Sequence, residues 1–122
     1  MKQPGEYEFG FERLKVYQLA LEFLYQIFDL SDRLPARFQS SLGDQLRRAA
    51  LSISNNIAEG NDKKSKREKA QYFKRASDST RECISMFNVL LGRQLLDDVG
   101  WRSLRSTGRQ ITSMIRALVD GL

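Results

Sequence analysis

The sequence predicts an all-α fold, an antiparallel up-down-up-down four-helix bundle. Four segments repeat apolar residues at the 3.6-residue spacing of an amphipathic helix, and no segment sustains the alternation that a half-buried strand requires. The two prolines, Pro4 and Pro35, lie at the edges of these segments. The connections are short, so consecutive helices should run antiparallel. We expect residues 1–10 to form an N-terminal arm and residues 11–122 to form the bundle.

The first predicted helix, at residues 12–33, ends before Pro35 because the residue before a proline disfavours helical backbone. It carries more apolar surface than one bundle seam buries. Its core stripe is flanked by a second apolar band: Leu14, Tyr17, Leu21, Leu24 and Phe28. Unburied apolar surface of this extent usually marks an interface, which predicts self-association. In the alternative, the N-terminal arm folds back over the band with Tyr7, Phe9 and Phe11.

Three further helices, each with a single narrow apolar stripe, are predicted at residues 42–59, 65–93 and 98–119. The second helix is expected to end at Gly60, because glycine suits a helix C-terminus. The third is expected to begin at Ser65, which forms a capping-box pattern with Glu68. Cys83 falls on the apolar stripe of the third helix, so we expect a buried thiol that packs as a small hydrophobe.

The composition excludes several classes of function. The chain has 122 residues, one cysteine and no histidine. Without histidine, the commonest general base and metal ligand is missing, so we expect no metal site, no cofactor and no Ser–His–Asp or Cys–His catalytic group. No apolar run approaches the ~20 residues of a membrane span, and residues 1–10 lack the apolar stretch of a signal peptide. A single cysteine fits a reducing compartment, and we expect a cytoplasmic protein.

Positive charge is concentrated in the second half of the chain. Residues 1–62 carry a net charge of −2 and residues 63–122 a net charge of +7, in a chain of net charge +5. This asymmetry predicts an anionic partner, because the guanidinium fork suits phosphate. The predicted nucleic-acid-binding residues are Lys63, Lys64, Lys66, Arg67, Lys74, Arg81, Arg102, Arg105, Arg109 and Arg116. In the alternative, the lysine-rich stretch serves only solubility, and the arginines pair with carboxylates of the first helix (Glu22, Asp29, Asp32) or of a neighbouring subunit.

A polar stripe flanks the core of the second helix, and one carboxylate occupies the matching flank of the third. The residues are Gln45, Arg48, Ser52, Asn56 and Glu59, with Glu82. We expect a polar network that fixes the helix register through contacts such as Arg48–Glu82 or Asn56–Glu82. The alternative is an acid site on Glu59 and Glu82, because paired carboxylates are catalytic when their pKa values are driven apart. No catalytic residue is predicted, since the chain has no histidine to support such a site.

The runs at residues 45–50 and 52–60, the latter ending in Asn56-Ile57-Ala58-Glu59-Gly60, resemble the signature of a known family. It comprises the four-helix-bundle proteins encoded in intervening sequences of bacterial large-subunit ribosomal RNA genes. Residues 11–17, 34–35 and 76–82 also fit, except that Asp78 stands where the family often has glycine. The resemblance covers nearly the whole chain. It implies a homo-oligomer, notably a pentamer, and no catalytic residues.

A similar bundle serves as the accessory variability determinant of diversity-generating retroelements, where it contacts a reverse transcriptase and nucleic acid. We therefore expect a non-enzymatic, homo-oligomeric bundle that binds nucleic acid, either RNA or an RNA–protein particle. The alternative is a protein-interaction scaffold or a reverse-transcriptase accessory subunit, whose basic surface meets an acidic protein.

Overall fold

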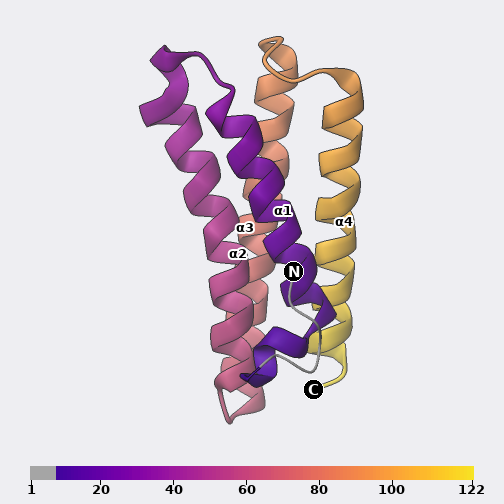
Figure 1. Cartoon of the computed structure of the whole chain (residues 1–122). Coiled ribbons are helices and arrows are strands. Elements are labelled where there is room, and N and C mark those ends of the chain that lie inside the picture. Colours follow the sequence, from indigo (N-terminus) through magenta and orange to yellow (C-terminus); the bar gives the residue numbers. More distant parts are fainter. Residues whose placement is uncertain (1–7) are drawn as a thin grey trace.

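The computed structural model describes residues 8–122, and it confirms the all-α prediction within that range. The helices are α1 (Lys15–Asp32), α2 (Asp44–Asp62), α3 (Lys66–Gly92) and α4 (Asp98–Asp120). They run alternately up and down, and each lies beside the one before it (Figure 1). The closest packing joins α2 to α3, whereas α1 and α4 make the fewest contacts of the neighbouring helices.

The core runs along the inner stripes of all four helices. Phe23, Ile53, Phe87 and Ile111, one from each helix, are fully buried. The rings of Phe23 and Phe87 meet edge to face with their centroids 5.8 Å apart, the geometry that aromatic quadrupoles favour. Cys83 is also fully buried, which confirms its predicted place in the core. Burying each large side chain stabilises the fold by roughly 1.5–3 kcal/mol.

Side chains cap the N-termini of α3 and α4. Ser65 Oγ accepts a hydrogen bond of 3.1 Å from the backbone N–H of Glu68, which confirms the predicted start of the third helix. A carboxylate oxygen of Asp97 accepts one of 2.7 Å from the N–H of Gly100. Each cap satisfies a backbone donor that the helix itself leaves unpaired, and each contributes about 1 kcal/mol.

The C-terminus of α3 closes in a Schellman motif. The N–H of Leu95 donates to the carbonyl of Leu90 at 2.8 Å, and the N–H of Gln94 donates to the carbonyl of Leu91 at 3.0 Å. Gln94 has a φ of 60°, the left-handed conformation that glycine most often supplies at this position.

The prediction that α2 ends at Gly60 is wrong. The helix continues to Asp62, and Gly60 is a buried residue inside it. A β-carbon built on Gly60 would lie 2.8 Å from two ring carbons of Phe73 and 3.1 Å from Cβ of Tyr72. The glycine therefore lets α2 and α3 approach closely near their connection.

The α1–α2 connection contains two short helical turns that were not predicted. They are η3 (Ala36–Phe38), a 3-10 turn, and η4 (Gln39–Gly43), a π-helical turn that leads directly into α2. A further 3-10 turn, η2 (Gly10–Arg13), precedes α1. The first helix therefore begins three residues later than predicted, and residues 1–7 of the predicted arm lie outside the described residues.

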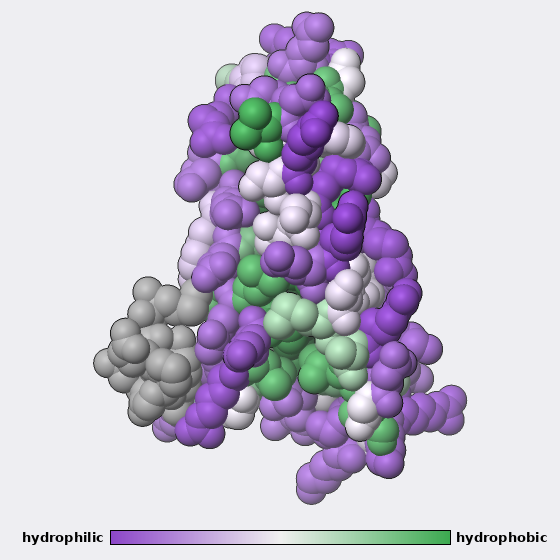
Figure 2. All heavy atoms as spheres, turned by 90° about the vertical axis from the view of Figure 1, so that its right-hand side faces the viewer, coloured by the Kyte–Doolittle hydropathy of each residue, from purple (hydrophilic) through white to green (hydrophobic). Residues whose placement is uncertain are grey.

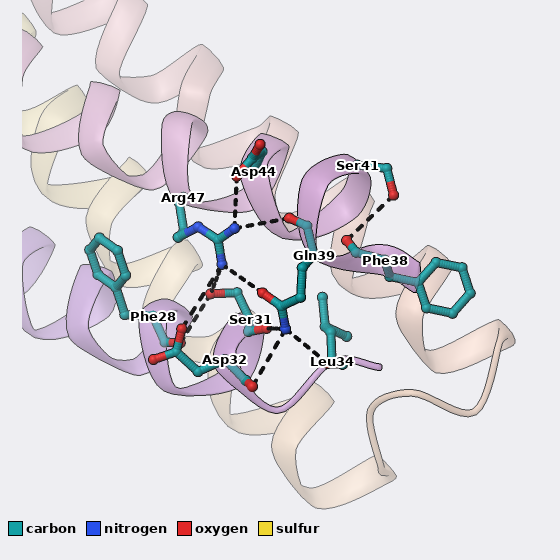
Figure 3. Close-up of polar contacts among 9 residues, drawn as sticks. All are labelled: Phe28, Ser31, Asp32, Leu34, Phe38, Gln39, Ser41, Asp44 and Arg47. Atoms are coloured by element: carbon teal, nitrogen blue, oxygen red, sulfur yellow. Dashed lines mark hydrogen bonds and ion pairs between the residues drawn. The ribbon is translucent and has the colours of Figure 1, made fainter. Parts of the chain in front are cut away.

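Arg47 of α2 holds this connection against the end of α1 (Figure 3). Its Nη1 donates to Ser31 Oγ at 3.0 Å and to Gln39 Oε1 at 3.3 Å. Its Nη2 donates to the backbone carbonyl of Gln39 at 2.9 Å and to Asp44 Oδ1 at 2.8 Å. Gln39 in turn donates to the carbonyls of Ser31 and Leu34 at 2.7 and 2.8 Å. One guanidinium thus joins α1, the π-helical turn and α2.

Candidate nucleic-acid interface

Six of the predicted cations lie on α3, beyond its first turn, and on the side of α4 next to it. We call this surface the α3/α4 basic face: Lys74, Arg81, Arg102, Arg105, Arg109 and Arg116. Contacts between α3 and α4 show that these residues share one surface. Arg105 donates to Asn88 of α3, and Arg116 of α4 shares a groove with Lys74 and Arg81 of α3. Arg102 and Arg109 fall on the same side of α4 as Arg105 and Arg116 by the 3.6-residue period.

The groove between α3 and α4 is open to solvent and has a volume of about 480 Å³. Besides its three cations it presents the hydroxyls of Ser77, Thr112 and Ser113, and two carboxylates, Asp78 and Asp120. Arg81 pairs with Asp78 at 3.1 Å, but both side chains are exposed. An exposed pair of this kind contributes at most about 1 kcal/mol, so an incoming anion can compete for Arg81.

The other arginines of α4 are free of such pairs. Within residues 8–122, Arg102, Arg109 and Arg116 are exposed and make no side-chain hydrogen bond or ion pair. The alternative prediction, in which carboxylates of the first helix of the same chain neutralise them, is therefore not supported among these residues. An exposed helix face normally mixes signs, because opposite charges three or four residues apart stabilise it.

Seen from the α4 side, the surface is divided (Figure 2). Apolar side chains gather in the lower half of this view, and hydrophilic side chains surround them. Four apolar residues at the C-terminal end of the chain are partly buried and pack against the core: Met114, Leu118, Val119 and Leu122. Val119 also lines the groove between α3 and α4. The four arginines of α4 fall within about 60° of one another by the 3.6-residue period, outside the apolar stripe of this helix.

The lysine-rich stretch lies at the α2–α3 turn, at the same end of the bundle as the C-terminus of α4 (Figure 1). Lys63 pairs with Glu59 at 3.6 Å, and its ammonium lies 5.1 Å from the ring centroid of Tyr72. Lys64, Lys66 and Arg67 are exposed. Arg67 lies seven residues before Lys74, so it continues the row of α3 cations toward this end.

The structure adds two residues that sequence reasoning missed, Asn88 and Trp101. Oδ1 of Asn88 accepts hydrogen bonds from Trp101 Nε1 at 2.9 Å and from Arg105 Nη1 at 3.0 Å. The guanidinium carbon of Arg105 lies 4.7 Å from the centroid of the Trp101 ring. Trp101 and Arg105 are four residues apart on α4, which signals their contact, but the register of Asn88 follows only from the packing of α3.

The predicted polar network is smaller than expected. Asn56 donates to the hydroxyl and the carbonyl of Ser52 at 2.9 and 2.8 Å, and Ser79 Oγ donates to Ser52 Oγ at 2.9 Å. Ser79 was not predicted. The predicted contacts of Glu82 with Arg48 and Asn56 are absent among residues 8–122, and Gln45, Arg48 and Glu82 all lie exposed. The hydrogen bond of this network that joins α2 to α3 is therefore the one between the hydroxyls of Ser79 and Ser52.

The alternative acid site on Glu59 and Glu82 is not formed. The bonded Ser52 and Ser79 mark one level of the bundle. From this level Glu59 lies seven residues down α2, and Glu82 lies three residues up α3. At about 1.5 Å per residue, the two positions are separated by about 15 Å along the bundle. Carboxylates that cooperate in hydrolysis lie within roughly 5–9.5 Å of each other.

The apolar band of α1 is only partly available as an interface. Leu24 is 5% exposed and belongs to the core, so its assignment to an oligomer surface is wrong. Leu14, Tyr17 and Leu21 are partly buried against the core, and Phe28 is 37% exposed. The band lies on the side of α1 that faces α2, because Ser31 on that side bonds Arg47.

The fold-back alternative receives support from Phe11. Its ring meets the Tyr17 ring edge to face at 5.0 Å, and Phe9 stacks on Phe11 at 5.9 Å. Tyr7, the third residue of that prediction, lies outside the described residues. Burial raises the pKa of Tyr17, and the carboxylate of Glu12 and the hydroxyl of Tyr25 raise it further.

Residues 8–122 hold no cluster of three or more potential metal-ligating side chains. In the same range, none of the helices has the length and hydropathy that crossing a bilayer requires. Cys83 is not an activated thiol, because burial raises its pKa to about 12, with a smaller contribution from the nearby Glu82 carboxylate.

Comparison with known proteins connects the chain to one family. The family model described as 23S rRNA-intervening sequence protein matches residues 12–117. A crystal structure of a protein of unknown function from the S23 ribosomal protein family of Bacteroides thetaiotaomicron has the same fold. It is 18% identical, with a TM-score of 0.75 over 86% of this chain and 95% of that one. No curated protein matches the sequence. The chain therefore belongs to the 23S rRNA-intervening sequence protein family.

Proposed function

We propose that the protein binds the phosphate backbone of RNA through the α3/α4 basic face. The observation that carries this proposal is the row of exposed arginines on α4 that have no partner within residues 8–122: Arg102, Arg109 and Arg116. Lys74 and Arg81 add positive charge on the facing side of the groove. Keeping like charges together without counterions is unfavourable, and phosphates relieve it by accepting the guanidinium donors.

The proposed binding is driven by charge and tolerates changes of sequence. Contacts to phosphate oxygens fix a protein on nucleic acid but do not read its bases. The basic residues that define the face include no aromatic ring, and the ring of Trp101 beside it has Arg105 against one side. The family's description refers to 23S rRNA intervening sequences, which makes RNA the first nucleic acid to test.

Fluorescence anisotropy with a labelled RNA at several salt concentrations tests this proposal. We expect the logarithm of the binding constant to fall linearly with the logarithm of salt, because phosphate contacts release counterions. Replacing Arg109 and Arg116 by alanine should make the slope shallower by about two units, one for each lost phosphate contact. The absence of binding at about 50 mM salt would refute the proposal.

Arg48→Ala is the matched control for these variants. Arg48 is an exposed arginine of α2 that has no partner within residues 8–122, and it lies outside the α3/α4 basic face. The same loss of one charge there should leave the salt slope nearly unchanged. If Arg48→Ala weakens binding as much as Arg109→Ala, the affinity reflects net charge and not this face.

We further propose that the chain self-associates through the exposed part of the apolar band on α1 and its neighbour α2. Phe28 of the band is 37% exposed; outside the band, Tyr25 of α1 is 56% exposed and Leu51 of α2 is 46% exposed. Sedimentation velocity should show an oligomer that Phe28→Asp dissociates, because a carboxylate in an apolar interface is costly to desolvate. Val99→Asp is the control, since Val99 is 78% exposed at the start of α4. A monomer at all concentrations would contradict self-association.

A further inference from the structure

Asn88 and Trp101 fix one arginine of the α3/α4 basic face in place. Arg105 is half-buried, its guanidinium lies 4.7 Å from the centroid of the Trp101 ring, and its Nη1 donates to Asn88 Oδ1 at 3.0 Å. The same oxygen accepts the Trp101 indole N–H at 2.9 Å. The amide oxygen of Asn88 on α3 therefore binds both the arginine and the tryptophan ring that lies against it.

We propose that Asn88 and Trp101 are positioning residues that hold Arg105 as a preformed phosphate-binding anchor. The anchor lies in the part of the α3/α4 basic face near the N-terminus of α4. This inference rests on the RNA-binding function proposed above. The other α4 arginines are exposed and form no side-chain bonds within residues 8–122, so each must lose rotamer freedom when it binds. Arg105 has already lost much of that freedom in the folded protein.

The side chain that holds Arg105 is a neutral amide, which favours a role in phosphate binding over a purely structural contact. Arg47 and Arg81 are held by carboxylates, at 2.8 and 3.1 Å, which neutralise them. Asn88 is uncharged, so it orients Arg105 and leaves its positive charge intact. A guanidinium has five N–H donors, and its hydrogen bond to Asn88 occupies one of them. The remaining donors and the full charge are available to phosphate oxygens.

Two substitutions of Asn88 distinguish the effect of positioning Arg105 from the effect of its positive charge on RNA binding. Asn88→Ala removes the holding oxygen but no charge, so RNA affinity should fall about threefold to tenfold with an unchanged salt slope. Asn88→Asp holds the guanidinium and neutralises it, so the salt slope should become shallower by about one unit. Gln110→Ala is the matched control, because Gln110 is an exposed amide of α4 whose side chain makes no hydrogen bond within residues 8–122.

Trp101 provides a local readout, because it is the single tryptophan of the chain. Titrating unlabelled RNA into the protein should change the Trp101 emission, since phosphate binding at Arg105 changes the field beside the indole ring. Thermal unfolding followed by circular dichroism would show whether the Asn88 variants remain folded. The change of emission should disappear in Asn88→Asp.

The outcomes distinguish this inference from the function on which it rests. If RNA binds with the expected salt dependence, but Asn88→Ala binds as tightly as Gln110→Ala and the Trp101 emission stays constant, Arg105 is no anchor and RNA binding stands. If Asn88→Ala makes the salt slope shallower, the role of Asn88 is not one of positioning, and the inference fails. If no RNA binds to the protein, both proposals fall.

Discussion

The backbone of Gly60 in α2 lies directly against the ring of Phe73 in α3, and a β-carbon on Gly60 would come within 2.8 Å of two ring carbons. Both residues are buried, and the aromatic ring has little room to move. The closest helix pair of the bundle thus depends on one missing methyl group.

Replacing Gly60 by alanine should destabilise the protein by about 1–3 kcal/mol. Alanine would gain roughly 0.5–1 kcal/mol of helix propensity, but overpacking against Phe73 and Tyr72 forces the helices apart. Urea unfolding measures the change. Gly92→Ala is the control, because nothing lies within 4 Å of a β-carbon built there. Equal stability of the two variants would show that α2 and α3 can separate freely at Gly60.

Replacing Gln94 by glycine should stabilise the protein by about 1 kcal/mol. Gln94 has a φ of 60° in the Schellman motif that ends α3, and a side chain there crowds the backbone. Glycine adopts this conformation without strain, although it loses more backbone entropy on folding. The midpoint of thermal unfolding measures the gain. Gln94→Ala retains a β-carbon and should show no such gain, and a gain of the same size would point to the glutamine side chain.

Replacing Arg47 by alanine should destabilise the protein by about 2–3 kcal/mol, since its guanidinium makes the charge-assisted bonds that join α1, the π-helical turn and α2. Arg47→Lys should recover little, because one ammonium does not reproduce the forked geometry. Chemical denaturation compares these variants with Arg48→Ala, which removes the exposed neighbouring arginine. We expect Arg48→Ala to remain within about 0.5 kcal/mol of the native chain. Comparable losses at positions 47 and 48 would refute a special role for Arg47.

Stability should fall with rising pH between pH 9 and 12, partly through Cys83. Burial raises the pKa of Cys83 from 9.0 to about 12, so within this window the unfolded thiol loses its proton and the folded one keeps it. The folded state then binds more protons, and the free energy of unfolding decreases by up to about 1.4 kcal/mol per pH unit. Below pH 9 this contribution is fully present.

The Cys83 contribution is the difference between the pH profiles of the native chain and of Cys83→Ala. Tyrosines and lysines titrate in the same range, but they are common to both proteins. The alanine variant should be less stable at neutral pH, because it leaves a small cavity, and its stability should decline less steeply above pH 9. Parallel profiles would contradict the assignment.

The helices could be predicted from sequence because each has a buried stripe with a 3.6-residue period. The end of α2 was misplaced, because glycine is typical of a helix C-terminus and the packing of Gly60 against Phe73 depends on a distant segment.

Adjacent arginines show a similar limit of prediction from sequence. Arg48 was predicted in a network and lies exposed, whereas Arg47, one residue earlier, makes the contacts. That choice depends on η3 and η4, which have no periodic pattern.

The basic residues were predictable as a group, since charge and spacing are read directly from the sequence. Their division among surfaces was not. Lys63 is engaged by Glu59 and Tyr72, and Arg105 by Asn88 and Trp101. Asn88 and Trp101 are 13 residues apart and meet only because α3 and α4 fold back on each other. Contacts of this kind require the register of two packed helices.

The unequal packing of the four helices has a consequence for the order of folding. Among adjacent helices, contacts are densest between α2 and α3, which are joined by a short turn, and fewest between α1 and α4, which lie at opposite ends of the chain. Closing a short loop costs less entropy than joining distant segments. The α2–α3 hairpin should therefore form first and exchange its amide hydrogens last, while the seam between α1 and α4 opens locally before the rest of the bundle unfolds.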